Sequence, residues 1–403
     1  MEGDIITYSH EFQVGSTSLK QINKKRVLHY IKKNGGYSRS DIAKGLLISK
    51  PTVSNIVDEL LEEGLVREKE SERASSAGGR KPYQIYFNQD AFYIVGIDIG
   101  GTSIEIAVMN LIGFITDKTS FDTQRYVEHN LVNKIATTVT ELLEKNRIDV
   151  EKVYGVGVGV PGITDVEKGI VIDAPSIGWK NTPLKEQLES LLPYPVYIDN
   201  DVNVAALGEQ WKGTGNTNKN FLMITLGTGI GCGLIINGEL YRGSSYAAGE
   251  IGYMITDKVA AEEKYDYAFH GYGFLDSHVG GPSITRRMLR HLQENNRDKK
   301  DLSAKKIFLM ASEGDEAAIK IVNESVSHLA YALVNVISIV NPGLIILGGG
   351  ISKSMNSYLT SLETTIEKHL PVKTDIVITN VEDVSLIGAG YLLLREHESI
   401  LKV

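Results

Sequence analysis

Apolar positions in the first ninety residues recur at helical spacing, and turn residues divide them into three groups. These groups predict helices at Gln21–Asn34, Arg39–Leu46 and Lys50–Glu63. Ser38 is placed to cap the second helix, and Pro51 fits the first turn of the third. The residues expected to face inward are Ile22, Val27, Leu28 and Ile31, then Ile42, Ala43 and Leu46, and finally Val53, Ile56, Val57, Leu60 and Leu61.

Two strand-like runs, Leu65–Glu68 and Tyr83–Phe87, follow the third helix and are separated by a polar stretch rich in serine and glycine. Three helices and a hairpin in this order predict a winged helix-turn-helix, which places a recognition helix in the major groove of DNA. Its base- and phosphate-contacting residues would be Lys50, Thr52, Ser54 and Asn55. The alternative is a three-helix interaction module with a solvated polar face.

The stretch Gly78–Pro82 follows this head and has the composition of a minor-groove contact. Glycine lets the backbone approach DNA closely, and arginine is the side chain that a narrow minor groove attracts. We therefore assign Gly79, Arg80 and Lys81 to DNA binding. A flexible interdomain linker with incidental charge is the alternative.

From Phe92 onward the pattern changes to short apolar strands alternating with amphipathic helices, which is typical of an α/β fold. The predicted strands are Tyr93–Ile97, Glu105–Val108, Val153–Val160, Val196–Ile198, Phe221–Leu226 and Leu344–Leu347, and the predicted helices are Leu131–Asn146 and Asp315–Ile339. A strand-turn-strand opening occurs twice, at Ile97–Val108 and Leu222–Ile236, which indicates two related lobes.

Three glycine turns follow predicted strands, and each could bind phosphate through backbone N–H groups. The residues that would bind a nucleotide are Asp98, Gly100, Gly101 and Thr102 in the first turn, Thr228 and Gly229 in the second, and Gly348 and Gly349 in the third. One such turn alone is weak evidence for a nucleotide-binding site. Three turns in this order are strong evidence for it.

Composition narrows the class of protein. A length of 403 residues predicts two or three domains. Residues 1–90 carry 14 Lys and Arg against 12 Asp and Glu, a net charge of +2, so the total net charge of −8 leaves −10 on the remaining residues. Cys232 is the single cysteine, which excludes an intramolecular disulfide. No apolar run approaches the roughly 18 residues of a membrane span, and Met1–Ser16 does not resemble a signal peptide. We expect a soluble cytoplasmic protein without a membrane partner.

Taken together, the motifs of the body resemble the ROK family of sugar kinases and sugar-responsive repressors. The matching segments are Asp98–Thr102, Val160–Gly162, Gly178–Trp179, Asn200–Asn203, Gly227–Gly231, Ala248–Gly252 and Leu347–Gly350. With the winged head, the chain is similar to the subgroup of xylose-repressor and NagC-type transcription factors. This resemblance implies a two-lobed, actin-like (ribonuclease H-like) sugar kinase fold. It also implies a head at 1–74, a linker and wing strand at 75–90, a first lobe at 91–205 with 390–403, and a second lobe at 206–389.

The resemblance also assigns roles to individual residues. Asp201 matches the family's general base, whose carboxylate takes the proton of the attacking sugar hydroxyl. The residues expected to bind sugar are Asn200, Asp201, Glu250, Gly162, Tyr253 and Asp276. Mg-ATP would be the cofactor if kinase activity is retained.

The zinc site of the family kinases is missing from this sequence. Tyr253 stands where the family has a zinc-binding histidine, and Met254–Gly273 contains no cysteine. His270 and His278 alone make a poor structural site, so we expect no zinc. Tyr265, Tyr267, Phe269 and Tyr272 would hold this loop by packing, or would stack on a ligand larger than a monosaccharide.

We interpret the chain as a sugar-responsive transcriptional repressor. A homodimer or a dimer of dimers would bind a palindromic operator, and a mono- or oligosaccharide in the ROK cleft would weaken that binding. The alternative is an ATP-dependent sugar kinase, possibly bifunctional, and the sequence does not separate a repressor from an activator.

Overall fold

A computed structural model of the chain describes residues 19–70, 83–127, 130–262, 273–295, 302–397 and 401. The chain divides into two compact units, residues 1–91 with 397–403 (the head) and residues 92–396 (the body). None of the described helices is both long enough and apolar enough to cross a membrane.

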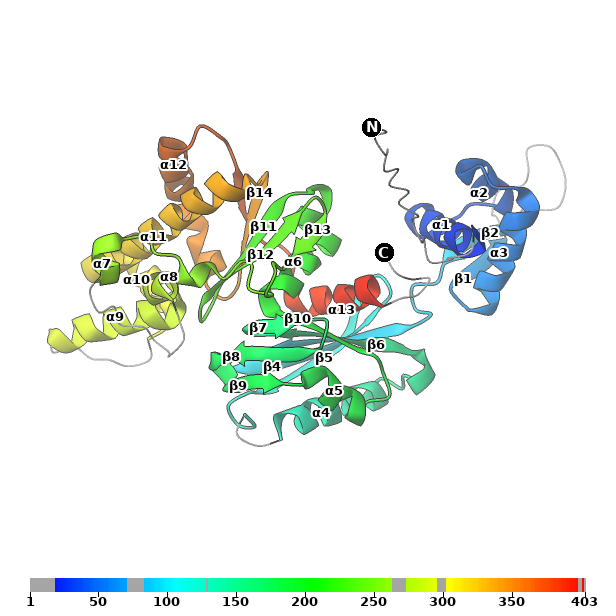
Figure 1. Cartoon of the computed structure of the whole chain (residues 1–403), viewed down its shortest axis with the longest axis horizontal. Coiled ribbons are helices and arrows are strands. Elements are labelled where there is room, and N and C mark those ends of the chain that lie inside the picture. Colours follow the sequence, from blue (N-terminus) through cyan, green and yellow to red (C-terminus); the bar gives the residue numbers. More distant parts are fainter. Residues whose placement is uncertain are drawn as a thin grey trace, which may run out of the picture. The chain divides into compact units, whose positions relative to one another are not determined.

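The head contains three helices followed by a two-stranded antiparallel hairpin. They are α1 (Leu19–Asn34), α2 (Arg39–Leu46), α3 (Lys50–Glu62), β1 (Val66–Glu70) and β2 (Tyr83–Phe87). This is the predicted winged helix-turn-helix, and it is drawn in blue in Figure 1.

Side-chain caps set the beginnings of α2 and α3. Ser38 and Asp41 form a capping box on α2, and Ser49 accepts a hydrogen bond from the Thr52 amide at the start of α3. Most residues of the predicted apolar faces form the core, whereas Leu46 and Leu61 are half-buried and Ile22 is exposed. Ile22 is 44% exposed, because the first turn of α1 extends beyond the helices that cover Val27 and Ile31.

The body contains two five-stranded sheets built in the same way. The first consists of β3 (Tyr93–Ile99), β4 (Ser103–Asn110), β5 (Ile115–Asp122), β6 (Val153–Val160) and β10 (Val196–Asn200). The second consists of β11 (Phe221–Leu226), β12 (Ile230–Ile236), β13 (Glu239–Tyr241), β14 (Leu344–Gly348) and β15 (Asp375–Ile378).

In both sheets the first strand lies at the centre, antiparallel to the second and parallel to the fourth. The spatial orders are β10-β6-β3-β4-β5 and β15-β14-β11-β12-β13. The two predicted related lobes and the ribonuclease H-like fold are therefore confirmed. We call the part of the body built on the first sheet the first lobe, and the part built on the second sheet the second lobe.

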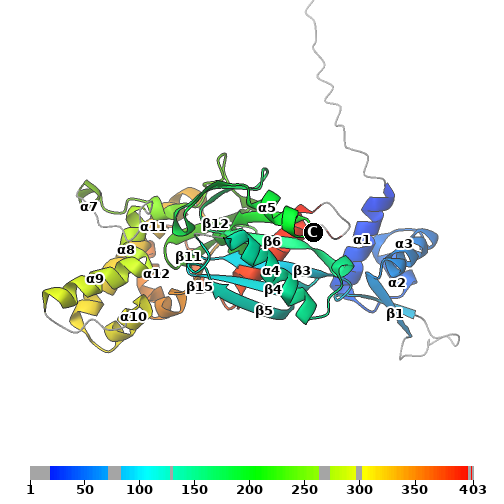
Figure 2. The ribbon, with the colours of Figure 1, turned by 90° about the horizontal axis from the view of Figure 1, so that it is seen from below.

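Helices cover the outer faces of both sheets. In the first lobe, α4 (Leu131–Lys145) packs on β4 and β5, and α5 (Leu184–Leu191) packs on β10 (Figure 2). A small antiparallel sheet adds β7 (Ile163–Asp165), β8 (Ile170–Ala174) and β9 (Trp179–Thr182). Short 3-10 helices occur at Val150–Lys152, Pro175–Ile177, Thr214–Thr217, Ile251–Tyr253 and Ser352–Tyr358.

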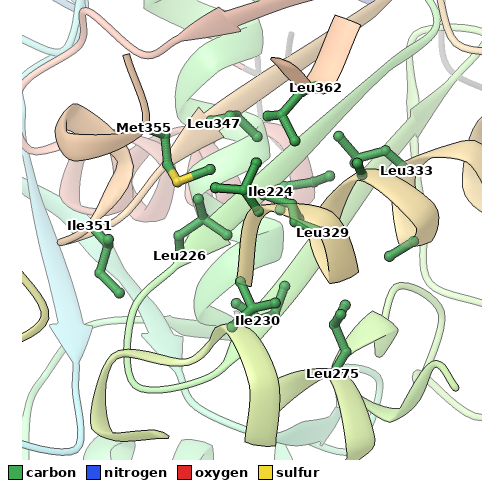
Figure 3. Packing of buried hydrophobic residues seen from close by; sticks show 14 of the residues in the cluster. Ile224, Leu226, Ile230, Leu275, Leu329, Leu333, Leu347, Ile351, Met355 and Leu362 are labelled. Atoms are coloured by element: carbon green, nitrogen blue, oxygen red, sulfur yellow. The ribbon is translucent and has the colours of Figure 1, made fainter. Parts of the chain in front are cut away.

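The second lobe buries its apolar side chains around one long helix. Its helices are α7 (Lys258–Glu262), α8 (Phe274–Val279), α9 (Gly281–Glu294), α10 (Ala304–Ser312), α11 (Glu316–Val340) and α12 (Leu359–His369). Figure 3 shows Leu329 and Leu333 of α11 in one cluster with Ile224 of β11 and Met355. This core anchors the loops that follow β11 and β14.

Two further helices, α6 (Asp201–Lys212) and α13 (Val384–Glu396), lie between the two sheets (Figure 1). Glycine allows them to cross at close range. A Cβ atom added to Gly388 of α13 would lie 1.6 Å from the Val204 carbonyl oxygen, and one on Gly208 of α6 would lie 2.2 Å from the Val384 carbonyl oxygen. The predicted lobe boundaries at 205/206 and 389/390 fall within these helices, and residues 397–403 group with the head.

We predict that Gly388→Ala lowers the free energy of unfolding of the body by about 3 kcal/mol or more, because the new methyl group has no room against Val204. Differential scanning calorimetry of the full chain measures the change. Gly343→Ala is the matched control, since its added Cβ meets nothing closer than 3.9 Å. Equal effects of the two substitutions would contradict the close-crossing interpretation.

Candidate functional site

A cleft of about 400 Å³ lies within the body and brings together residues from all three glycine turns. All six predicted sugar-binding residues line it: Gly162, Asn200, Asp201, Glu250, Tyr253 and Asp276. Seven of the eight predicted nucleotide-binding residues line it as well: Asp98, Gly100, Gly101, Thr102, Thr228, Gly229 and Gly349. Gly348 lies within β14 instead, where its backbone packs against the Met223 side chain.

The first glycine turn joins β3 to β4 at one wall of the cleft. The Gly100 amide donates to the Ser103 carbonyl at 2.9 Å, which closes the turn. From β5 and the loop after it, Thr123 Oγ1 donates to the Gly100 carbonyl and Gln124 Nε2 to the Gly101 carbonyl, each at 2.7 Å. These hydrogen bonds fix the turn from the side away from the cleft, so its other side can face a ligand.

Asn200 and Asp201 lie where β10 ends and α6 begins. Asn200 caps α6, because its Oδ1 accepts from the amides of Val202 and Asn203 at 2.9 and 3.2 Å. Its Nδ2 donates to the Gly162 carbonyl at 2.9 Å, so it also fixes the loop after β6. Asp201 is the first residue of the helix, and the cap thus determines where its carboxylate lies.

Burial and neighbouring charge raise the pKa of two aspartates in the cleft. The pKa of Asp201 is about 7, because burial disfavours its charged form and Asp98 and Glu250 add negative charge. The pKa of Asp98 is also about 7, owing to burial and to Glu105. A carboxyl group with a pKa near neutrality can exchange a proton with a hydroxyl group of a bound molecule.

Glu250 and Asp276 face the cleft from the second lobe. Gly249 has φ +90° and approaches the Cys232 carbonyl so closely that a Cβ would lie 1.7 Å away, which fixes the position of Glu250. Asp276 accepts hydrogen bonds from the amides of Ile230 at 2.7 Å and Gly273 at 3.0 Å. Asp276 therefore also ties α8 to β12.

Burial raises the pKa of both carboxyl groups of this pair, and Asp276 raises that of Glu250 further. The side chain of Tyr253 is 54% exposed at the same wall of the cleft.

Four polar residues of the cleft were not predicted as binding residues from the sequence. They are Asp173, Ser176, Thr225 and Ser385. Asp173 lies in β8 and Ser176 in the 3-10 helix that follows it, and neither element has a strong pattern in the sequence. Five carboxyl groups thus line the cleft, at Asp98, Asp173, Asp201, Glu250 and Asp276. None of its described lining residues is Lys, Arg or His.

The described residues contain no group of three or more His, Cys, Asp or Glu side chains arranged to hold a metal ion. His278 is instead stacked on Phe274, with ring centroids 4.2 Å apart, and contacts His328. Of the loop that stands in place of the family's zinc site, His270 and the aromatic residues Tyr265, Tyr267, Phe269 and Tyr272 lie outside the described residues.

The DNA-binding residues predicted on the head lie together in the first turns of α3. Lys50 and Asn55 are exposed, whereas Thr52 and Ser54 are half-buried. The Thr52 hydroxyl lies 2.7 Å from Ser49 Oγ. Gly79, Arg80 and Lys81 lie outside the described residues.

Arg39 positions this helix and was not identified from the sequence. It begins α2 and forms ion pairs of 2.7 Å with Asp58 of α3 and Glu68 of β1. Its Nη1 also donates to the Ser54 carbonyl at 3.3 Å. One guanidinium group therefore connects both helices of the helix-turn-helix to the wing.

Comparisons with known proteins match both units. A family model described as ROK family matches residues 94–396, and one described as MarR family matches residues 21–75. The glucokinase of Halalkalibacterium halodurans is 33% identical over 327 residues, which cover 78% of this chain and 98% of that enzyme.

The xylose repressor of Caldicellulosiruptor bescii is 30% identical over 366 residues, covering 87% of this chain and 89% of the repressor. That share exceeds the part of the chain in the body, so the match reaches into the head. A solved structure of a ROK family transcriptional regulator, a homologue of the E. coli MLC protein, has a TM-score of 0.77 and 23% identity. It covers 93% of this chain and 95% of its own, and supports the fold.

We predict that Asp98→Asn moves the titration midpoint of the Asp201 carboxyl group to lower pH, because one of the charges that raise its pKa to about 7 is removed. NMR titration of carbon-13-labelled aspartate, with Asp201→Asn as the assignment standard, measures the midpoint. Asp173→Asn is the control, since Asp173 lines the cleft but is not among the causes of the shift.

The substitution Asp98→Asn should also change how the free energy of unfolding depends on pH. Both folded-state pKa values lie near 7 and above the ordinary value of 3.8, so the folded chain holds protons that the unfolded chain has lost. Stability therefore falls as pH rises from about 4 to 7. Asp98→Asn should flatten this decline, because the substituted residue no longer titrates, and urea unfolding at a series of pH values measures the slope. An unchanged slope would contradict the raised pKa of Asp98.

Proposed function

Because the chain belongs to the ROK family, we propose that it is a transcriptional repressor that binds operator DNA through its head and releases it when a sugar occupies the cleft. One observation carries this: a helix-turn-helix with both strands of its wing stands on the same chain as a ROK body. An enzyme acting on sugar alone has no use for a recognition helix. The similarity to xylose repressors across both units supports the same function.

On the DNA side, α3 would enter the major groove with its first turns foremost. Asn55 and Lys50 are exposed there, and the amide of asparagine can pair with adenine while lysine binds guanine or phosphate. Thr52 and Ser54 would add hydroxyl contacts. Gly79, Arg80 and Lys81 would follow the minor groove beside it. Two copies paired through their bodies would place two recognition helices on half-sites about one helical turn apart.

On the sugar side, carboxylates and amides of the cleft would accept and donate hydrogen bonds to hydroxyl groups. Asp201 and Glu250 come from different lobes, so a sugar bridging them would favour one arrangement of the lobes over the other. An effector must make this distinction if it is to change DNA affinity. Gly162, Asn200, Tyr253 and Asp276 would complete the site.

The charge of the cleft indicates the class of sugar. Five carboxyl groups and no described basic residue would repel a phosphorylated or carboxylated sugar. We therefore infer that the effector is an uncharged saccharide, so that the carboxylates can bind its hydroxyl groups without an opposing charge.

A sugar kinase remains the second candidate, because the glucokinase similarity and the three glycine turns favour it. Glycines leave room for phosphate at these turns, since Gly227 and Gly350 face open space. Asp98, Gly100, Gly101, Thr102, Thr228, Gly229 and Gly349 would hold Mg-ATP, which would supply the phosphoryl group. Asp201 would accept the proton of the sugar hydroxyl.

We predict that Asp201→Asn abolishes the effect of sugar on DNA binding and leaves DNA affinity without sugar within about twofold, because Asp201 lies in the cleft and not in the head. The DNA probe is a duplex selected by the full-length protein from a randomised pool. D-xylose, D-glucose and N-acetyl-D-glucosamine are the sugar probes, and fluorescence anisotropy gives both affinities. Release of the duplex by a sugar 6-phosphate but not by the free sugar would contradict an uncharged effector.

The wild-type and Asp201→Asn proteins also decide between the two candidate functions, a repressor and a sugar kinase. ADP release from Mg-ATP and sugar, lost in Asp201→Asn, would make the chain a kinase. A sugar-dependent change in DNA affinity without ADP release would make it a repressor only. Both results together would make it bifunctional.

We predict that Asn55→Ala and Lys50→Gln weaken DNA binding in different ways. Loss of the Asn55 amide should cost about 1–3 kcal/mol at one base position and relax the preference there. Loss of Lys50 should weaken all duplexes evenly and reduce the salt slope by about 1. Lys373→Gln, which removes an exposed charge of the body, is the control. Identical behaviour of the three variants would contradict the role of α3.

A further inference from the structure

Two histidines pack against each other in the second lobe, and the proposed function uses neither of them. His278 lies in α8 and His328 in α11, and their ring centroids are 4.2 Å apart. Phe274 of α8 stacks on His278 at 4.2 Å and meets His328 edge-on at 5.7 Å. Both imidazoles are half-buried. The three rings therefore form a cluster between α8 and the long core helix α11.

Burial and hydrogen bonding keep both imidazoles neutral. His278 Nδ1 lies 2.8 Å from the Phe274 carbonyl oxygen, which has no proton to give, so Nδ1 carries the proton. Burial lowers the pKa of both histidines, and the positive charge of Arg287 lowers both further. The pKa of His328 falls to about 4. The two rings can therefore lie in contact at pH 7 without charge repulsion.

The cluster lies behind Asp276, one of the residues that line the cleft. His278 follows Asp276 by two residues, and positions two apart in a helix point to nearly opposite sides. Asp276 faces the cleft, and His278 accordingly faces α11. Arg287 Nη2 donates to the His278 carbonyl oxygen at 2.6 Å and to Ser325 Oγ of α11 at 2.5 Å. The helix α8 is therefore attached to α11 just after Asp276.

The cluster also holds the loop that follows Tyr253. Thr256 Oγ1 lies 2.7 Å from His328 Nδ1. The neighbouring Ile255 is 60% exposed, so its packing contributes little to holding the loop. At the start of the loop the backbone lies directly on α8, since a Cβ atom added to Gly273 would be 2.4 Å from Tyr253 Cα. The loop is thus held at its start by close packing and three residues later by a hydrogen bond.

We propose that His328 is a positioning residue that holds the second-lobe wall of the cleft ready for a sugar. Its Nδ1 fixes the loop after Tyr253 through Thr256. Its ring packs on His278 and so supports the helix that carries Asp276. This inference rests on the proposed function. Because α11 is a fixed support, the wall keeps its shape before any ligand arrives, and a wall arranged in advance loses less conformational entropy on binding.

Substitutions at Thr256 test the hydrogen bond at nearly constant volume. Valine has the shape of threonine but lacks the hydroxyl group, whereas serine keeps the hydroxyl group. His328→Phe keeps an aromatic ring in the cluster and removes Nδ1. Thr285→Val is the matched control, because Thr285 Oγ1 of α9 in the same lobe donates within its own helix, to the Gly281 carbonyl at 2.9 Å.

Isothermal titration calorimetry of the full-length protein with D-xylose, D-glucose and N-acetyl-D-glucosamine measures sugar affinity. We expect Thr256→Val and His328→Phe each to weaken binding about fivefold, and Thr256→Ser and Thr285→Val to stay within about twofold of wild type. Both weakening substitutions remove the same hydrogen bond, so the double variant should bind no more weakly than the weaker single variant. Wild-type affinity in Thr256→Val, an equal loss in Thr256→Ser or Thr285→Val, or additive losses in the double variant would overturn the role of His328.

Hydrogen exchange without any sugar separates this inference from the proposed function. The amides of Tyr253 and Met254 are hydrogen-bonded within the 3-10 turn before Thr256, at 3.3 and 2.9 Å. Thr256→Val should speed their exchange about threefold or more, and Thr285→Val should not. A wild-type chain that binds none of the sugars would overturn the proposed function, while the exchange data still test His328. Unchanged exchange in Thr256→Val would overturn its positioning role.

Discussion

The close crossing of α6 and α13 is the constraint on which the rest of the body depends. The two helices lie between the sheets, and the backbone of each occupies the space that a side chain would need on the other at Gly208 and Gly388. Such an interface has few alternative packings, because any added volume displaces a backbone carbonyl. The two lobes are therefore joined through a tightly packed pair of helices, and the cleft lies at the start of one of them.

The cleft depends on the same crossing for its chemistry. Asp201 is the first residue of α6, and Asn200 fixes that end of the helix by capping it. Opposing carboxyl groups come from β3 and from the loop after β13, so their spacing is set by the arrangement of the lobes. The raised pKa values of Asp98 and Asp201 follow first from burial of the two carboxyl groups and then from the crowding of negative charge around them. Bound hydroxyl groups would relieve it by hydrogen bonding to the carboxylates.

Much of the fold could be predicted from the sequence, and the failures have physical causes. The α2 helix and the strands β2, β6 and β11 begin and end at the predicted residues, because caps and turn residues mark their ends. The α6 helix was missed because Val202–Glu209 is buried on every side and shows no amphipathic period. In the site, Asp201 stood out as a motif after a strand. Asp173 did not, because only the fold brings it beside cleft residues that are distant in sequence.

The α6 helix begins in the cleft with Asp201 and crosses α13 at Gly208, and this has a consequence for the evolution of such proteins. A substitution at Asp201 changes the contacts with a ligand, whereas Gly208 and Gly388 cannot gain even a methyl group without displacing a backbone carbonyl. Ligand preference can therefore diverge at one end of the helix while the crossing with α13 is retained. Descendants that acquire a new effector should accordingly differ around the start of α6 and keep glycine where the two helices cross.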